Sequence, residues 1–406
     1  MNARASSLFI VFTVAIDAMG LGLIIPVMPD LIRELRGTSI ADAAYWGGLL
    51  TFTYASMQFL CGPLLGNLSD RFGRRPVLIV SLLFMGFDYL LMAIAPTLLL
   101  LFVARFISGI TGATYAVAAA YLSDTSEKGT RSSSFGLIGA AFGIGFILGP
   151  ALGGLLGEFG VRMPFLVAGG LALLNAAFGF FVLPETLPAE KRRRFEWRRA
   201  DPFYTLLRIK NLPGIGGLML VVLIHSIAQN VYPAVWSYFT IEKFTWSVST
   251  VGLSLAAYGL SAAVVQVWIL RIMLARFGES NTALLGLLIS LLTFIGIGFI
   301  DSTFLIFAAM PVVALGAMVG PSLQGLMADR VVDEEQGELQ GVFASILALA
   351  SIISPLLMTN IFKEFSEQNA PIYFPGAPFI ASAILTLLAL TFFIAFKKTR
   401  VNVGPI

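Results

Sequence analysis

Twelve apolar runs, each of about 20 residues or slightly more, are long enough to cross the hydrocarbon core of a bilayer as helices. Backbone polar groups must be satisfied within the segment in lipid, so single runs of this length indicate α-helices. With 57% hydrophobic and 12% charged residues, the composition is too apolar for a water-soluble surface. The sequence therefore predicts an all-α membrane protein with twelve transmembrane helices. The runs lie near 8–31, 44–66, 77–95, 97–122, 134–157, 163–183, 212–236, 248–272, 281–300, 303–329, 338–361 and 374–396.

The 26 lysines and arginines are distributed unevenly among the connections between these runs. Most fall on the cytoplasmic side if the N-terminus is cytoplasmic, so the positive-inside rule predicts that both termini are cytoplasmic. The longest connection divides the spans six and six. We therefore expect an N-terminal six-helix bundle (1–183), a cytoplasmic linker (184–211) and a C-terminal six-helix bundle (212–406). Arg-Phe-Gly follows both the second and the eighth span, at Arg71 and Arg276, which indicates a duplicated, pseudo-symmetric unit.

The connection after the second span, 66–75, holds four charges and two glycines in ten residues. It must form a tight polar turn between two membrane helices. Two interpretations remain open: a turn that only satisfies the positive-inside rule, or a gate in which Asp70 meets a helix N-terminus or Arg131 and controls cytoplasmic access. The candidate gating residues are Gly66, Asp70, Arg71, Gly73, Arg74, Arg75 and Arg131.

Three ionisable residues lie inside predicted spans, where charges are costly and mark functional sites. Asp17, Asp88 and Arg105 all fall roughly 12–17 Å into their helices at a rise of about 1.5 Å per residue. An acid at that depth can load and release a proton when access switches between the two sides. The alternative is a static Asp–Arg pair that only stabilises the bundle. We predict proton coupling through these three residues.

A run of small residues in the fifth span repeats glycine every four positions, which permits close approach by a neighbouring helix. A proline within it removes one helical hydrogen bond and permits a bend. The residues of this motif are Gly145, Gly149, Pro150, Gly153 and Gly154.

These motifs together resemble those of the major facilitator superfamily. Residues 66–75 match its signature loop, G-x-L-x-D-R-x-G-R-R, at every fixed position. Residues 145–154 match G-x-x-x-G-P-x-x-G-G, which marks drug:proton antiporters in this superfamily. Residues 17–29, 88–91 and 108–114 are similar to tetracycline efflux pumps. The resemblance implies proton-coupled export of hydrophobic or amphipathic small molecules, such as drugs or antibiotics, by alternating access.

The second half of the chain departs from the tetracycline pumps in two respects. Those pumps carry an essential acidic residue in the ninth span and a histidine in the eighth. Residues 281–300 contain no acidic residue, and 248–272 contain no histidine. These departures argue against tetracycline itself as the substrate. Proton coupling through Asp17 and Asp88 remains the expectation.

By analogy with the superfamily, polar and aromatic residues of the second, seventh and tenth spans are expected to line the substrate cavity. Four of them follow helical spacing on one stripe of the seventh span. The histidine among them, His225, is either a second proton site or a neutral, hydrogen-bonded residue between helices. The substrate-binding candidates are Tyr54, Gln58, His225, Gln229, Asn230, Tyr232, Trp236 and Gln324.

Other functions have less support in the sequence. One histidine and one cysteine give no metal-ligand spacing, and no nucleotide-binding signature is present. We expect no enzyme activity, no cofactor other than the coupling proton and no nucleic-acid partner. The remaining alternatives are a proton-coupled symporter, a sugar or siderophore exporter, and a polytopic membrane receptor or enzyme. The predicted setting is a monomer in contact with lipid in the bacterial inner membrane.

Overall fold

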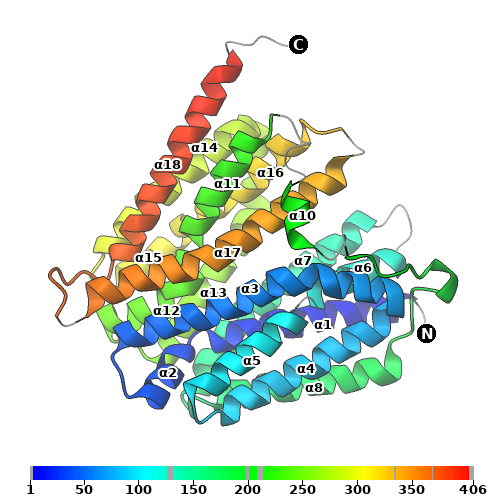
Figure 1. Ribbon diagram of the computed structural model, residues 1–406. Helices are drawn as coiled ribbons and strands as arrows, with labels where there is room; N and C mark the ends of the chain where they lie inside the picture. Colours follow the sequence, from blue (N-terminus) through cyan, green and yellow to red (C-terminus); the bar gives the residue numbers. More distant parts are fainter. Residues whose placement is uncertain are drawn as a thin grey trace. The chain divides into compact units, whose positions relative to one another are not determined.

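The computed structural model describes residues 3–112, 114–125, 131–197, 201–207, 214–332, 335–367 and 369–401, and its elements there are all helices (Figure 1). The helices before the long connection are α1 (Ala3–Ile24), α2 (Met28–Arg36), α3 (Ile40–Phe72), α4 (Arg74–Ile94), α5 (Leu98–Thr111), α6 (Thr114–Thr125), α7 (Arg131–Gly157) and α8 (Met163–Val182). The connection contains η1 (Ala189–Lys191) and α10 (Pro202–Leu207). The helices after it are α11 (Gly216–Gln229), α12 (Val231–Phe244), α13 (Val248–Val264), η3 (Val265–Ile269), α14 (Leu270–Phe299), α15 (Thr303–Ala314), η4 (Leu315–Met318), α16 (Val319–Ala328), α17 (Gln336–Ser366) and α18 (Ala377–Val401).

Within these ranges, 9 helices are long and apolar enough to cross a membrane, or 10 if the bent pair α1 and α2 forms one span. One of them, Val248–Phe299, is 52 residues long and is broken at Gly278, where φ is 71° and ψ is 171°. It therefore holds the predicted eighth and ninth spans. The predicted second span lies in α3, which has 33 residues but is richer in glycine and polar side chains. The structure confirms an all-α, multi-pass membrane fold.

The helices gather into two units, each with its own packing. The first contains Met1–Thr38, Thr53–Pro202 and Trp246–Ala256, and the second contains Ser39–Phe52, Phe203–Thr245 and Ala257–Ile406. Helices α3 and α13 thus contribute one end to each unit. The change from one unit to the other at Pro202 falls inside the predicted linker 184–211.

In the first unit, α1 packs against α7 and α8, and α4 packs against α5 and α8. The glycines of α7 make the first of these contacts possible. A Cβ added at Gly149 would lie 2.5 Å from the carbonyl oxygen of Met19. On the other side of α1, Thr13 and Asn175 hydrogen-bond through their side chains at 3.2 Å. Small residues on one face and a buried polar pair on another therefore hold α1 between two helices.

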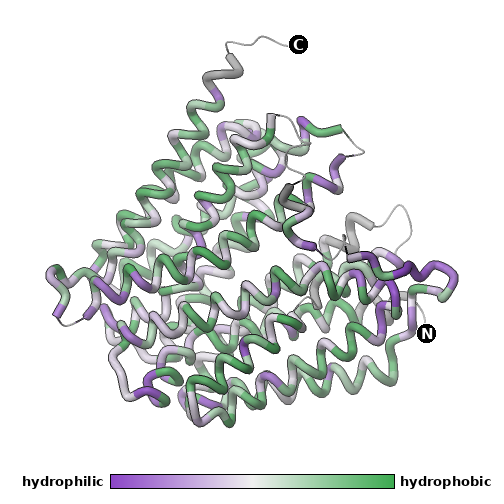
Figure 2. The backbone as a smooth tube through the Cα atoms, viewed as in Figure 1, coloured by the Kyte–Doolittle hydropathy of each residue, from purple (hydrophilic) through white to green (hydrophobic). Residues whose placement is uncertain are grey.

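In the second unit, α11 packs against α17 and α18, while α14 packs against α16 and α18. Their contact faces form a core that includes Leu218, Leu287, Leu323, Val342 and Phe393. Hydrophobic residues run along the helices of both units, and hydrophilic residues gather at helix ends and connections (Figure 2). Large apolar side chains also cover outward faces, as a bilayer solvent requires.

Candidate functional site

The charged loop between α3 and α4 is held by ion pairs. The Asp70 carboxylate accepts from the Arg74 guanidinium at 2.6 Å, and the same guanidinium binds Asp124 of α6 at 3.2 Å. Only 12% of the Arg74 side chain is exposed, so water screens these pairs less than surface pairs. Asp70, Arg74 and Asp124, the loop triad, therefore tie the loop to the end of α6.

The linker after α8 closes over this loop through Glu185. Its carboxylate accepts hydrogen bonds from the backbone N–H groups of Arg74, at 2.9 Å, and of Arg75, at 3.3 Å. Because these groups lie at the start of α4, they have no acceptor within the helix. Gly73 has φ 107°, and a Cβ there would collide with the Glu185 carboxylate. Asn67 further donates to the carbonyl oxygen of Glu196 at 2.6 Å. Glu185 was not predicted from the sequence, because its position after the sixth span is the one signal that distinguishes it.

The structure shows a partner of Asp70 that the sequence did not predict. We expected a helix N-terminus or Arg131, whereas the observed partner is Arg74. The side chain of Arg131 lies outside the described residues. Arg71 stacks over Phe72 at 5.0 Å, and Arg75 donates to the carbonyl oxygen of Phe180 at 2.5 Å.

We predict that Glu185→Gln lowers the thermal stability of the purified protein, by about 2 kcal/mol for a charged acceptor of backbone N–H groups. The measurement is the melting temperature in detergent. Glu190→Gln is the matched control, because Glu190 is exposed in the same linker. Equal melting temperatures for the two variants would show that Glu185 does not stabilise the start of α4.

The three ionisable residues predicted inside the spans of the first unit lie near a pair of tyrosines. Asp17 of α1, Asp88 of α4 and Arg105 of α5 all interact electrostatically with Tyr54 and Tyr89. Asp88 is 2% exposed and lies close to Ser108, but neither of its carboxylate oxygens accepts a hydrogen bond of good geometry from a described residue. The Arg105 guanidinium instead contacts the Met92 sulfur at 3.1 Å. Within the described residues, Asp88 and Arg105 share no hydrogen bond.

The predicted polar residues of the second span adjoin this cluster. Gln58 donates to the Tyr54 hydroxyl at 3.1 Å and to the carbonyl oxygen of Gly112 at 2.9 Å. Gly112 ends α5, so its carbonyl has left the helical ladder. The Tyr54 ring faces the Arg105 guanidinium at 5.8 Å. Tyr54 and Gln58 therefore link the charge cluster to the break between α5 and α6.

A polar chain runs through the second unit from α11 to α14. The His225 and Gln229 side chains approach at 3.4 Å, and Gln229 donates to the Ser290 hydroxyl at 3.4 Å. Asn230 donates to the carbonyl oxygen of Ser226 at the end of α11, at 2.8 Å. Gln324 lies in a separate contact, 2.6 Å from Gln340. The ninth predicted span thus contributes a neutral hydroxyl to this chain.

Aromatic rings surround Tyr232 in the same unit. Its ring lies 5.5 Å from Phe294, 5.8 Å from Tyr258, 5.9 Å from Phe379 and 6.0 Å from Trp236. These distances are typical of favourable aromatic contacts. Sequence spacing predicted only Tyr232 and Trp236, because the other three rings come from different spans.

A family model described as the Major Facilitator Superfamily matches residues 10–230 and 218–405. The chain belongs to the major facilitator superfamily. It is 37% identical over 390 residues to the class C tetracycline resistance protein of Escherichia coli, covering 96% of each chain. It is 38% identical over 392 residues to the class G protein of Vibrio anguillarum, covering 95% of this chain and 96% of the relative.

A solved nucleoside transporter shares the fold with a TM-score of 0.80 at 14% sequence identity, covering 97% of this chain and all of the other. The predicted membership of the superfamily is therefore confirmed. This superfamily protein is a multi-pass membrane transporter for drug efflux rather than an enzyme, and its substrate is a small molecule.

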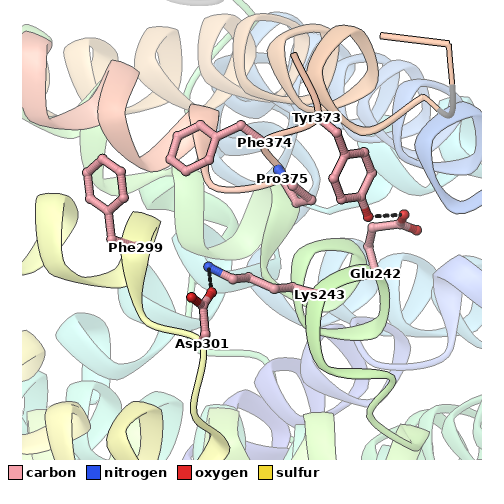
Figure 3. A pocket seen from close by; sticks show the side chains of 7 residues that line it. All are labelled: Glu242, Lys243, Phe299, Asp301, Tyr373, Phe374 and Pro375. Atoms are coloured by element: carbon pink, nitrogen blue, oxygen red, sulfur yellow. Dashed lines mark hydrogen bonds and ion pairs between the residues drawn. The ribbon is translucent and has the colours of Figure 1, made fainter. Parts of the chain in front are cut away.

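A pocket of about 340 Å³ lies at the end of the second unit where the loop between α17 and α18 returns. Figure 3 shows Lys243 pointing to Asp301, at 2.8 Å, and Tyr373 pointing to Glu242, at 2.7 Å. Burial, the hydrogen bond to Glu242 and its negative charge raise the pKa of Tyr373 to about 12. The Tyr373–Glu242 contact fastens the loop of this transporter to α12, and the Lys243–Asp301 pair joins α12 to the connection after α14.

The raised pKa means that the neutral form of Tyr373 is favoured in the folded protein. The contact should be complete below the ordinary value of 10.0 and should be lost as pH rises towards about 12. We expect the tyrosinate absorbance difference between wild type and Tyr373→Phe to appear near pH 12. Glu242→Gln should move this titration towards the ordinary value. A wild-type titration already at the ordinary value would contradict the Glu242 contact.

Proposed function

We propose that this transporter exports amphipathic, ring-containing drugs of the tetracycline class in exchange for protons, across the bacterial inner membrane and as a monomer. The observation that carries the proposal is the cluster of Asp17, Asp88 and Arg105 around two tyrosines in the first unit. Buried acids in a transporter support a proton site. The printed names of the relatives support the drug class.

Proton exchange is assigned to Asp17, with Asp88 and Arg105 setting its electrostatic surroundings. Asp17 is half-buried and Asp88 is 2% exposed, so we assign the exchangeable proton to the more accessible of the two acids. The proton is the coupling ion, and we propose no further cofactor. The α7 glycines allow α1, which carries Asp17, to approach α7 closely.

Drug recognition in the second unit is assigned to the Tyr232 rings and the His225–Gln229–Ser290 chain. Flat rings stack on aromatic side chains, and a few polar groups orient them. Because 281–300 holds no acidic residue, the proton site of this transporter is placed in the first unit. The tetracycline class thus remains compatible with the departures in the second half.

The gate is assigned to the loop triad and Glu185. Their ion pairs and backbone hydrogen bonds join α3, α4, α6 and the linker in the described structure. Opening of the cytoplasmic side would require some of these contacts to break. The contacts therefore stabilise the closed state relative to the open state.

The test is drug uptake into everted membrane vesicles, where export appears as accumulation. We expect tetracycline or doxycycline to accumulate when respiration acidifies the vesicle interior, and to leak out when nigericin removes the pH gradient. Loss of accumulation for every tetracycline, dye and quaternary amine tested would overturn the proposal. Accumulation driven by the opposite pH gradient would favour the symporter.

A further inference from the structure

Two adjoining pockets form one groove on the outward face of the first unit. One, of about 750 Å³, lies between the ends of α3 and α5 and the start of α4, and its lining includes Phe72 and Val80. The other, of about 430 Å³, continues along α4 past Phe87. Both share Phe84 and Ile107, so the two pockets meet at these side chains. Their volumes are in the range of small-molecule sites.

This groove faces the bilayer. Val80 is 49% exposed, Phe84 48% and Phe87 58%, all on α4, which is long and apolar enough to cross a membrane. Lipid tails can cover such side chains without any specific site. Exposure alone therefore does not distinguish the groove from the rest of the lipid-facing surface.

Asp88 makes the groove different. Of the described residues that line the two pockets, it is the only charged one. Arg105 and Ser108 act on its carboxylate, but neither oxygen of Asp88 accepts a hydrogen bond of good geometry from a described residue. A buried carboxylate without a partner is costly, and a lipid tail cannot supply one. An apolar ligand with a positive charge complements both the groove and its acid.

We propose that this groove is a membrane-facing binding site for lipophilic cations. The rings of the ligand lie against Phe84, Phe87 and Ile107, and its delocalised positive charge lies next to Asp88. Aromatic walls favour such cations through the negative faces of their rings. The site rests on the proposed drug export, because it gives membrane-dissolved drugs a first contact with the first unit.

The test is equilibrium binding of tetraphenylphosphonium to the full-length protein in lipid nanodiscs, with empty nanodiscs subtracted. Tetraphenylborate, which has the same shape and the opposite charge, is the control ligand. We expect the wild type to prefer the phosphonium, and Asp88→Asn to weaken phosphonium binding by about tenfold or more, equivalent to about 1.4 kcal/mol. Asp88→Glu, which keeps the charge, should retain the preference for the cation.

Two tryptophan variants separate the groove from the general lipid-facing surface. Ile107→Trp should fill the junction of the two pockets and reduce phosphonium binding. Leu174→Trp is the matched control, because Leu174 is 69% exposed on α8 and lies outside the groove, and its binding should equal that of the wild type.

Equal phosphonium binding by wild type and Asp88→Asn, or equal binding of phosphonium and borate by the wild type, would overturn the site. Tetracycline uptake into everted vesicles is measured on the same wild-type preparation. If uptake is present while the groove binds no cation, this inference fails and the proposed function stands. If uptake of all drugs is absent, the proposed function fails independently of the binding result.

Discussion

Gly149→Val is expected to prevent folding of most of the protein. A Cβ at this position would lie 2.5 Å from the carbonyl oxygen of Met19 and 2.9 Å from the Cα of Gly22, and both are backbone atoms that cannot rotate away. Helices α1 and α7 would have to separate. Overpacking of this kind costs about 1–3 kcal/mol even where side chains can adjust. The measurement is the monodisperse peak of a fluorescent fusion in size-exclusion chromatography, which should be nearly lost.

Gly143→Val provides the matched control on the same helix. In the described part of the chain, no atom lies within 4 Å of a Cβ added at Gly143. This variant should give a peak close to that of the wild type. Equal peaks for the two variants would mean that the α1–α7 contact is not as tight as the structure indicates.

Asp17→Asn is expected to reduce proton-driven export to the level of vesicles without the transporter. The amide is similar in size to the carboxylic acid but cannot release a proton. Exchange of labelled for unlabelled drug needs no net proton movement, so this counterflow should persist. The combination of lost accumulation and retained counterflow separates a coupling defect from a folding defect.

Asp30→Asn is the control for this prediction. Asp30 lies in α2 at the protein surface, where it pairs with Arg33 at 3.5 Å, and surface pairs contribute little. Its export should match that of the wild type. Unchanged drug accumulation by Asp17→Asn would remove Asp17 from the coupling mechanism.

The membrane fold was predictable because spanning a bilayer imposes a length and a hydrophobicity on every helix. The boundaries of the helices were less predictable. The first predicted span, 8–31, includes a break of 47° between α1 and α2, which hydropathy does not mark. The eighth and ninth spans join through Gly278, and only its positive φ, like that of Gly73, separates them.

The site was only partly predictable, because its contacts join residues far apart in the chain. Depth in the bilayer pointed to Asp17, Asp88 and Arg105, and they do surround one pair of tyrosines. Glu185 and Asp124 could not be found this way, since surface acids carry no periodic signal. Their roles depend on which helix ends meet.

The duplicated loop also differs between the two halves. Arg276-Phe277-Gly278 repeats the earlier motif, but Glu279 stands where Arg74 stands in the first copy. The Glu279 carboxylate lies against Gly325 of α16. The second copy therefore offers an acid at the position where the first offers the cation of the loop triad. We expect charge substitutions in the first loop to affect gating more than the equivalent substitutions in the second loop.

The most direct test of proton-coupled export uses the purified protein in liposomes that contain a pH-sensitive dye. A tetracycline gradient is imposed without any pH gradient, and valinomycin with potassium clamps the membrane potential. The account predicts that drug movement drives protons in the opposite direction, and that Asp17→Asn shows no proton movement. Drug movement without proton movement in the wild type, or with protons in the same direction, would contradict it.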